Sequence, residues 1–139
     1  MVKVVIGARS LLGLIFLVFG LNGFLEFFPM PPLKEAMQSY AGALTGTGYF
    51  FPLLKATEAL MGLCLLSNMF VPLALIVLSP IVIHIALANI FLDTTGLPIA
   101  IVVVVTMLVT AKGYWPYFSG VLTRKAEVDP ILRTKTGNR

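Results

Sequence analysis

The sequence predicts an all-α integral membrane protein, built as a bundle of four transmembrane helices with a short interfacial helix in the first outer loop. Of the 139 residues, 58% are hydrophobic and only 12% are charged. A soluble domain carries about a quarter charged residues and under half apolar ones, so this chain has too little polar material to cover a water-facing surface. The apolar residues also form four long runs, and a helix of roughly 20 residues crosses a bilayer.

The first predicted helix covers residues 4–28, which are apolar apart from a few polar positions. A cleaved signal peptide is the rival interpretation of such an N-terminal segment. The run is long for a signal peptide, however, and no small-x-small cleavage pattern follows it. Prolines at positions 29, 31 and 32 end the helix. We therefore expect it to be retained as a membrane helix.

The short interfacial helix is predicted over residues 33–44. Its apolar residues recur at i, i+3, i+4, i+7, i+8 and i+11, which places them in one stripe. They are Leu33, Ala36, Met37, Tyr40, Ala41 and Leu44. The segment is too short to span a bilayer, so we expect it to lie along the outer membrane surface. The residues TGTGY at 45–49 superficially resemble a potassium-filter loop, but a glycine hinge after a surface helix explains them equally.

The other three membrane helices are predicted over residues 50–67, 70–92 and 97–118. Each has a proline in its first turn, where the missing backbone N–H costs nothing. Pro80 lies inside the third helix and is expected to kink it. Asp93 or Thr95 can cap the fourth helix, which ends in aromatic residues typical of the membrane–water boundary. Residues 119–139 are polar and basic, and we expect a partly disordered cytoplasmic tail.

The basic residues predict the orientation, because Lys and Arg near the ends of membrane helices stay on the cytoplasmic side. Eight of the ten lie near the two ends of the chain, and the outer loops hold only Lys34. An even number of crossings also places both ends on the same side. We therefore expect a multi-pass protein of the cell membrane with both termini in the cytoplasm. Basic residues gathered at the chain ends also argue against nucleic-acid binding, which needs a basic face.

Six polar residues fall towards the extracytoplasmic ends of the predicted helices and form a candidate ligand pocket: Glu58, His84, Lys55, Glu26, Asn22 and Asn89. An ionisable group in hydrocarbon costs ~2.5–3.5 kcal/mol on insertion scales, so each needs a partner or a wet cavity. In a structural interpretation, Lys55 pairs with Glu58 or Glu26, while His84 and the asparagines tie helices together. In a functional one, Glu58 and His84 take up or release a proton. No residue is assigned as catalytic.

One face of the first helix is predicted to point into the bundle. Arg9, Gly13, Phe16 and Gly20 lie within about 40° of one another on a helical projection. Small residues in such a row let a neighbouring helix approach closely. Arg9 then either points into the interior or extends its charged end to the cytoplasmic boundary.

The sequence argues against several redox and metal sites. The lone cysteine, Cys64, cannot form an internal disulfide or a dithiol pair. One histidine cannot supply both axial ligands of a b-type haem, and there is no thiolate cluster for iron and sulfur. A zinc ion needs three or four ligands, and only carboxylates could join His84. We therefore expect no metal and no tightly bound cofactor.

Several short motifs can be read in the first three predicted membrane helices: RSLLG at 9–13 and FG at 19–20, Glu58 with GLCLL at 62–66, and PLAL at 72–75 with His84. Together they resemble the DoxX family of small four-helix membrane proteins, and the similarity covers roughly residues 5–111. That resemblance implies a link to quinones and to oxidoreductases, and it singles out Arg9, Glu58 and His84. The chain departs from the family at Asn22 and Gly23, near the place where members often carry a basic residue.

The leading hypothesis is a membrane subunit of a redox system that binds a quinone-like ligand in the outer polar pocket. The expected partners are the lipid bilayer and a soluble or membrane oxidoreductase, and the chain could also form a homo-oligomer. One alternative is a non-catalytic scaffold that recruits a soluble oxidoreductase through the basic tail. Another is a carrier for a small metabolite.

Overall fold

The structure is a computed structural model that describes residues 1–26 and 32–136, and these residues contain no strand. The all-α class predicted from the sequence is therefore confirmed. The helices are α1 (Val2–Leu25), α2 (Glu35–Gly46), α3 (Phe50–Ser67), α4 (Val71–Phe91), α5 (Leu97–Gly113) and α6 (Pro130–Thr136), with 3-10 turns η1 (Thr94–Gly96) and η2 (Trp115–Phe118).

Four of these segments are long and apolar enough to cross a membrane: α1, α3, α4 and the stretch Thr94–Gly113 that joins η1 to α5. Large apolar side chains stay exposed on all four, including Leu14, Leu60, Ile83 and Leu108. A bilayer accommodates such faces, whereas a water-facing helix carries polar residues there. These features fit a multi-pass membrane protein.

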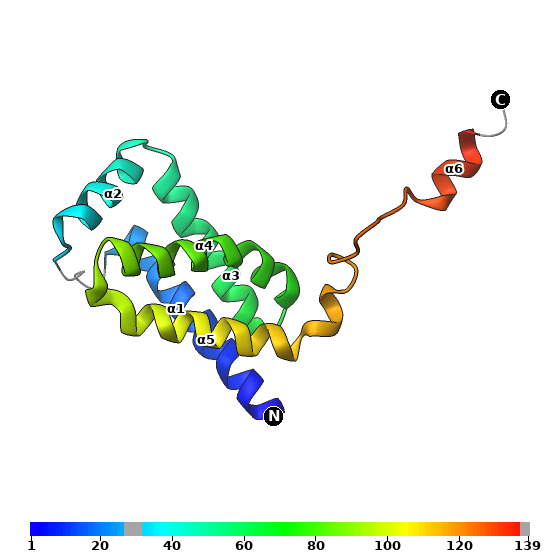
Figure 1. The fold of residues 1–139 in the computed structure, drawn as a ribbon, viewed down its shortest axis with the longest axis horizontal. Coiled ribbons are helices and arrows are strands. Elements are labelled where there is room, and N and C mark those ends of the chain that lie inside the picture. The colour runs from blue at the N-terminus through cyan, green and yellow to red at the C-terminus, as the bar shows by residue number, and fades with distance from the viewer. Residues whose placement is uncertain (27–31, 137–139) are drawn as a thin grey trace.

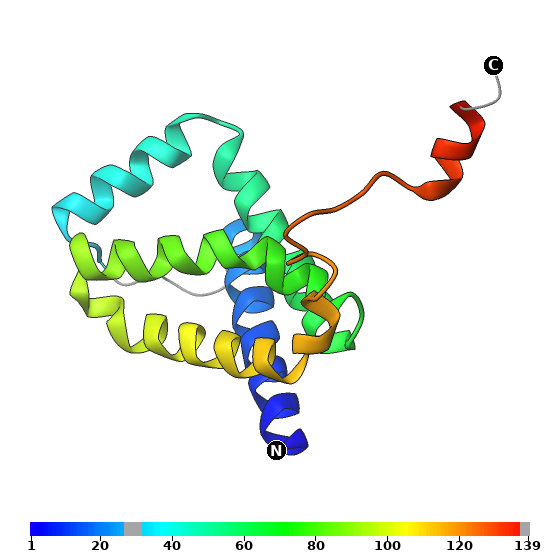
Figure 2. The ribbon, with the colours of Figure 1, turned by 45° about the vertical axis from the view of Figure 1, so that its right-hand side comes forward.

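The four long helices pack in a ring, in which α1 contacts α3 and α5, and α4 contacts the same two helices. They alternate in direction, so the bundle has two ends (Figure 1). At the α2 end lie α2, the start of α3 and η1. At the Arg9 end lie the start of α1, the α3–α4 turn and the end of α5, and the first turns of α1 project past the other helices there (Figure 2).

The buried core between the helices is mostly aliphatic. It includes Leu12 and Phe16 from α1, Leu65 from α3, Leu78 from α4 and Val103 from α5. Side chains from all four long helices therefore meet in one core, which fixes the helix ends against one another.

Helices α1 and α3 touch backbone to backbone, because glycines line their contact. A Cβ atom at Gly20 would lie 2.5 Å from the backbone N of Ala59, and a Cβ at Gly62 would lie 2.5 Å from the backbone N of Leu17. Real Cβ atoms do not approach backbone so closely. Gly13 is buried in the same face of α1, so this face allows the close helix contact that small residues permit.

The clearest differences from the predicted helix boundaries are at the end of α1, at the end of α5 and at both ends of α2. The first helix ends at Leu25, and Glu26 has a left-handed φ of 46°; positions 27 and 28 of the predicted span lie outside the described residues. The fourth helix ends at Gly113 instead of 118. Pro116 accounts for this, since it has no N–H to bond the carbonyl of Lys112. The short helix predicted over residues 33–44 lies two residues further along the chain, at Glu35–Gly46.

The tail contains a short helix, α6, that the sequence analysis did not anticipate. Pro130 is its first residue, and the backbone N–H of Ile131 donates to the Asp129 carboxylate at 2.9 Å. An acidic cap followed by proline is a common start signal. In both ribbon views α6 stands away from the bundle (Figures 1 and 2).

Replacing Gly20 by Ala should lower the midpoint of thermal unfolding of the detergent-solubilised protein. The new methyl group must displace the backbone of α3, and overpacking of this kind costs about 1–3 kcal/mol. Gly7→Ala is the matched control in the same helix, because no atom lies within 4 Å of a Cβ there. It should melt at or slightly above the wild-type midpoint, since Ala favours helix over Gly. Equal melting of the two variants would contradict the backbone contact.

Candidate functional site

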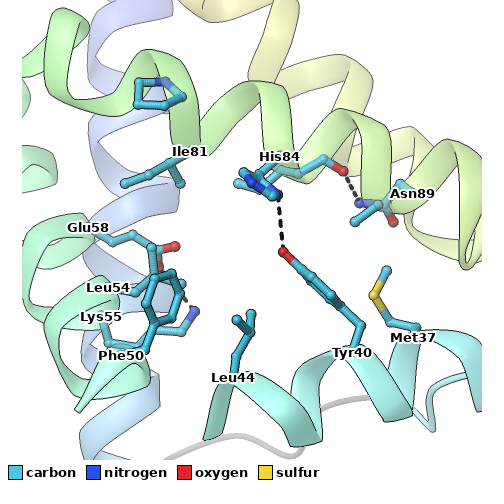
Figure 3. Close-up of a pocket in the computed structure, with 13 residues that line it drawn as sticks. Met37, Tyr40, Leu44, Phe50, Leu54, Lys55, Glu58, Ile81, His84 and Asn89 are labelled. Atoms are coloured by element: carbon cyan, nitrogen blue, oxygen red, sulfur yellow. Dashed lines mark hydrogen bonds and ion pairs between the residues drawn. The ribbon is translucent and has the colours of Figure 1, made fainter. Parts of the chain in front are cut away.

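A cavity of about 590 Å³ lies between α2, α3 and α4 at the α2 end of the bundle (Figure 3). Its polar lining residues are Tyr40, Lys55, Glu58, His84 and Asn89, and its other lining side chains are apolar. Small-molecule sites have this size and this mixture of apolar walls with a few polar groups. The cavity is therefore the candidate functional site, and we call it the α2-end cavity.

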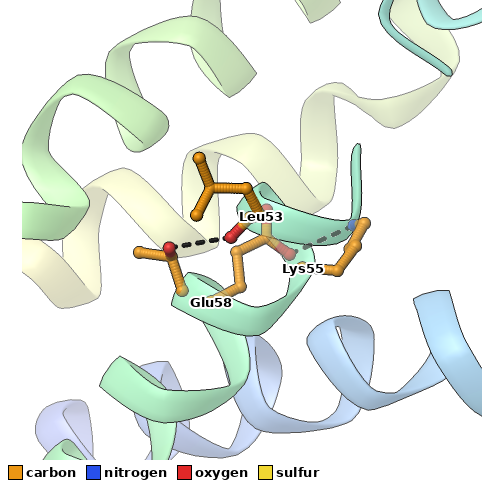
Figure 4. Close-up of polar contacts among 4 residues, drawn as sticks. Leu53, Lys55 and Glu58 are labelled. Atoms are coloured by element: carbon orange, nitrogen blue, oxygen red, sulfur yellow. Dashed lines mark hydrogen bonds and ion pairs between the residues drawn. The ribbon is translucent and has the colours of Figure 1, made fainter. Parts of the chain in front are cut away.

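One wall carries an ion pair on α3. Lys55 Nζ lies 3.1 Å from Glu58 Oε2 (Figure 4), and Glu58 is 4% exposed. The two residues are three apart, so their side chains meet on one helix face. Of the two partners predicted for Lys55, the structure shows Glu58, whereas Glu26 is exposed at the end of α1. Breaking a buried pair leaves an uncompensated charge, so this pair is expected to persist.

The aliphatic stem of Lys55 is held between α1 and an aromatic ring. A Cβ at Gly23 would lie 2.5 Å from Lys55 Cγ, so the glycine leaves room for this stem. Lys55 Nζ lies 5.4 Å from the centre of the Phe51 ring, within the range of a cation–π contact. Gly23 thus helps to set the direction in which the ammonium group reaches Glu58.

The facing wall is formed by His84 on α4 and Tyr40 on α2. The Tyr40 hydroxyl and His84 Nδ1 form a hydrogen bond of 3.1 Å, and the two rings are nearly parallel at 16° with centres 6.3 Å apart. This bond joins α2 to α4. In Figure 3 the His84–Tyr40 pair lies across the cavity from Lys55 and Glu58.

Sequence reasoning missed Tyr40 as a site residue, because it was counted as part of an apolar helix stripe. The structure turns that stripe towards the cavity, where Met37, Tyr40 and Leu44 all line the wall. The available signal was the tyrosine hydroxyl, the one polar group within an otherwise apolar stripe, since such a group usually finds a partner when it is covered.

The predicted polar residues divide into two groups in the structure. Lys55, Glu58, His84 and Asn89 line the cavity, and the Asn89 amide donates to the Ile85 carbonyl of its own helix at 2.7 Å. The remaining two do not line it: Asn22 is buried within α1, and Glu26 is exposed beyond its end.

Asp93 anchors the start of α2 to the loop between α4 and α5. One carboxylate oxygen accepts the backbone N–H of Lys34 at 3.0 Å, and the other accepts the backbone N–H of Thr95 at 3.0 Å and its hydroxyl. The Lys34 N–H, followed by the Thr95 hydroxyl and N–H, lowers the pKa of Asp93 from 3.8 to about 2. Asp93 is therefore ionised at neutral pH, and it joins two segments 59 positions apart in the sequence.

Among residues 1–26 and 32–136, no group of three or more His, Cys, Asp or Glu side chains is arranged to hold a metal ion. Comparisons with protein-family models, with curated proteins and with solved structures gave no match to this chain. The geometry and lining of the α2-end cavity are therefore the structural features from which a function can be inferred.

The arrangement can hold a flat, mostly apolar molecule that carries a polar atom at each end. His84 and Tyr40 offer nitrogen and hydroxyl groups on one side, and Lys55 with Glu58 offers an ammonium and a carboxylate on the other. The apolar residues between them include Leu54 and Ile81, which suit a ring rather than an ion.

Asp93→Ala should detach the start of α2, because the Lys34 N–H then loses its acceptor. We expect faster trypsin cleavage after Lys34 in the purified protein at neutral pH, while Thr95→Ala, which keeps the bond between Asp93 and Lys34, should be cleaved at nearly the wild-type rate. Since the pKa of Asp93 is lowered in the fold, its contribution is complete above about pH 4 and is lost as the pH falls towards 2. Unchanged cleavage of Asp93→Ala would show that α2 does not need this anchor.

Proposed function

We propose that this chain is a membrane subunit of a quinone-linked redox system and that the α2-end cavity binds a quinone-like head group. The observation that carries the proposal is the pairing of two polar walls across an apolar cavity. A quinone ring is flat and apolar, with two carbonyl oxygens at opposite ends. Its shape and polarity match the two walls.

The polar side chains have distinct parts in this proposal. The Tyr40–His84 pair keeps one N–H or O–H beyond its mutual bond and provides this donor for one carbonyl oxygen, and Lys55 provides a charged donor for the other. Hydrogen bonds to charged groups are the stronger kind, so Lys55 dominates the orientation of the ligand. Glu58 balances the charge of Lys55 and can accept or return a proton when the ligand changes its protonation state.

The membrane arrangement follows the charge distribution of the chain. Both termini lie in the cytoplasm in this proposal, which places the Arg9 end inside and the α2 end outside. Helix α2 then lies along the outer membrane surface and covers the cavity, so a lipid-soluble ligand reaches it from within the bilayer. In this proposal the chain binds the quinone-like ligand, and a partner oxidoreductase supplies the electrons that reduce it.

The resemblance of the sequence motifs to the DoxX family supports the redox part of the proposal, because that family is linked to quinones. Glu58 and His84, two residues that the resemblance singles out, both line the cavity. The resemblance and the cavity geometry therefore favour the same pair of side chains.

His84→Ala and Glu58→Gln should each weaken binding of a short-tailed ubiquinone analogue to the purified protein. His84→Ala removes a hydrogen bond to the ligand, and Glu58→Gln removes the charge partner that directs Lys55 towards it. The loss of a hydrogen bond that involves a charged group costs roughly 1.5–3 kcal/mol, so we expect a rise in Kd of about tenfold or more, measured by fluorescence titration. Ser79→Ala is the control on the same helix, because its hydroxyl bonds the Leu75 carbonyl and lies outside the lining. If both cavity variants bind as tightly as wild type, the cavity is not the site.

The position of α6 favours a second candidate, in which the basic tail recruits a soluble oxidoreductase. Helix α6 stands clear of the bundle in both views and is therefore accessible to a partner (Figures 1 and 2). This scaffold function needs no ligand in the cavity, so the two candidates can be tested separately.

A chain truncated after Phe118 should lose a soluble oxidoreductase partner identified by crosslinking and mass spectrometry, if the tail recruits it. Added peptide of residues 119–139 should compete with the full chain for that partner. Quinone binding by the truncated protein should stay at the wild-type level, because the cavity lies at the other end of the bundle. Retention of the same partner after truncation would rule out the scaffold function.

A further inference from the structure

A second cavity of about 420 Å³ lies at the opposite end of the bundle from the candidate quinone site. Its walls come from the first turns of α1, the α3–α4 turn and the end of α5. They include Val2, Val5, Ile6, Arg9, Asn68 and Tyr114. We call it the Arg9 cavity, and the proposed quinone site makes no use of it.

Arg9 is buried in this cavity, and among residues 1–26 and 32–136 its side chain has one hydrogen-bond partner. Its side chain is 8% exposed, and Nη1 donates to the Tyr114 hydroxyl at 3.0 Å. Its Nε is buried and has no hydrogen-bond partner among the described residues. A guanidinium has five N–H donors, and leaving a buried charge unsatisfied costs free energy. The cavity therefore lacks an acceptor that Arg9 needs.

None of the acidic side chains, all of which lie in the part of the chain that the structure describes, fills this role. The sequence has six acidic residues, and four lie at the α2 end: Glu26, Glu35, Glu58 and Asp93. The other two lie in the tail, where Glu127 is 3.7 Å from Arg133 and Asp129 caps α6. Arg9 is thus a buried cation for which the described residues supply no counter-charge.

The guanidinium is held in place by a chain of hydrogen bonds. The Tyr114 hydroxyl accepts from Arg9 and donates to Asn68 Oδ1 at 2.7 Å, so α1, α5 and the α3–α4 turn are joined by one chain of hydrogen bonds. Nearby, a Cβ at Gly113 would collide with the Val5 side chain, which shows how closely α1 and α5 pack. The part of the Arg9 guanidinium that has no partner among the described residues therefore lies in a cavity whose walls are held together by these contacts.

We propose that the Arg9 cavity binds an oxyanion, either the phosphate of an anionic phospholipid or a free phosphate-like ion. The planar fork of a guanidinium matches two oxygens of a phosphate and forms short, charge-assisted bonds. Val2, Val5 and Ile6 form an apolar wall beside the charge, which suits a head group with its acyl chains alongside. The exposed Lys3 and Lys112, each in a helix that lines the cavity, increase the positive potential around it.

The test uses the full-length chain, purified in a neutral detergent and stripped of lipid. Phosphatidylglycerol or phosphatidylcholine is then added back, and native mass spectrometry counts the lipid molecules bound to each chain. Thermal melting is recorded with either lipid or with inorganic phosphate. We expect one tightly retained phosphatidylglycerol per chain and at least a tenfold preference over phosphatidylcholine. If phosphate alone raises the melting midpoint and displaces the lipid, the ligand is a free oxyanion and the cavity assignment still holds.

Arg9→Gln should abolish this preference, because glutamine can still donate to Tyr114 but carries no charge. The loss expected is about tenfold or more in affinity, the usual effect of removing a charged hydrogen-bond partner. Tyr114→Phe should keep most of the preference, since the charge remains. Lys125→Gln, a change in the exposed tail, is the control for general electrostatic attraction and should bind as wild type.

A further pair of variants distinguishes a specific loss of binding from misfolding of the protein. Arg9→Lys retains the charge without the fork and should bind more weakly than wild type but better than Arg9→Gln. Ile6→Trp fills the apolar wall and should reduce lipid binding while Arg9 stays in place. Equal binding of the two lipids to wild type together with no effect of phosphate, or wild-type binding by Arg9→Gln, would overturn the proposal.

Discussion

The close contact between α1 and α3 is the constraint on which the rest of the bundle depends. Gly20 lies against the backbone around Ala59, and Gly62 lies against that of Leu17, so no side chain separates the two helices. Gly23, one turn further along α1, leaves the space through which Lys55 extends. The position of the ammonium group, and hence of the Glu58 carboxylate bonded to it, follows from this helix contact. A structural contact therefore determines one wall of the candidate site.

The two ends of the molecule differ in how far their buried charged groups are paired. At the α2 end, Lys55 and Glu58 satisfy each other, and Asp93 is satisfied by backbone N–H groups and by Thr95. At the Arg9 end, the Tyr114 hydroxyl is the one hydrogen-bond partner of the Arg9 side chain within the described part of the chain. Burial of an ionised group is tolerated when its partners are present. The first end is thus complete without a ligand, whereas the second end is not.

The sequence allowed the fold class and the long helices to be predicted, because these depend on local composition and helical spacing. The pairing of Lys55 with Glu58 could be predicted for the same reason, since the two residues lie on one helix. The contact of Tyr40 with His84 was not, because it depends on how α2 packs against α4 across a separation of 44 positions. The tail helix was missed although Asp129 and Pro130 supply its start signal, since a polar composition was taken to indicate disorder.

Two contacts attach α2 to the rest of the bundle and so maintain one wall of the candidate site. A tyrosine hydroxyl can both donate and accept, so the bond between Tyr40 and His84 Nδ1 can form whether that nitrogen accepts from the hydroxyl or donates to it. The bond between α2 and α4 is therefore compatible with either tautomer of the His84 ring. The second anchor, Asp93, stays ionised at neutral pH because its pKa is lowered to about 2. Together the two anchors hold α2 against α4 and the loop before α5, so that Met37, Tyr40 and Leu44 remain part of the cavity lining.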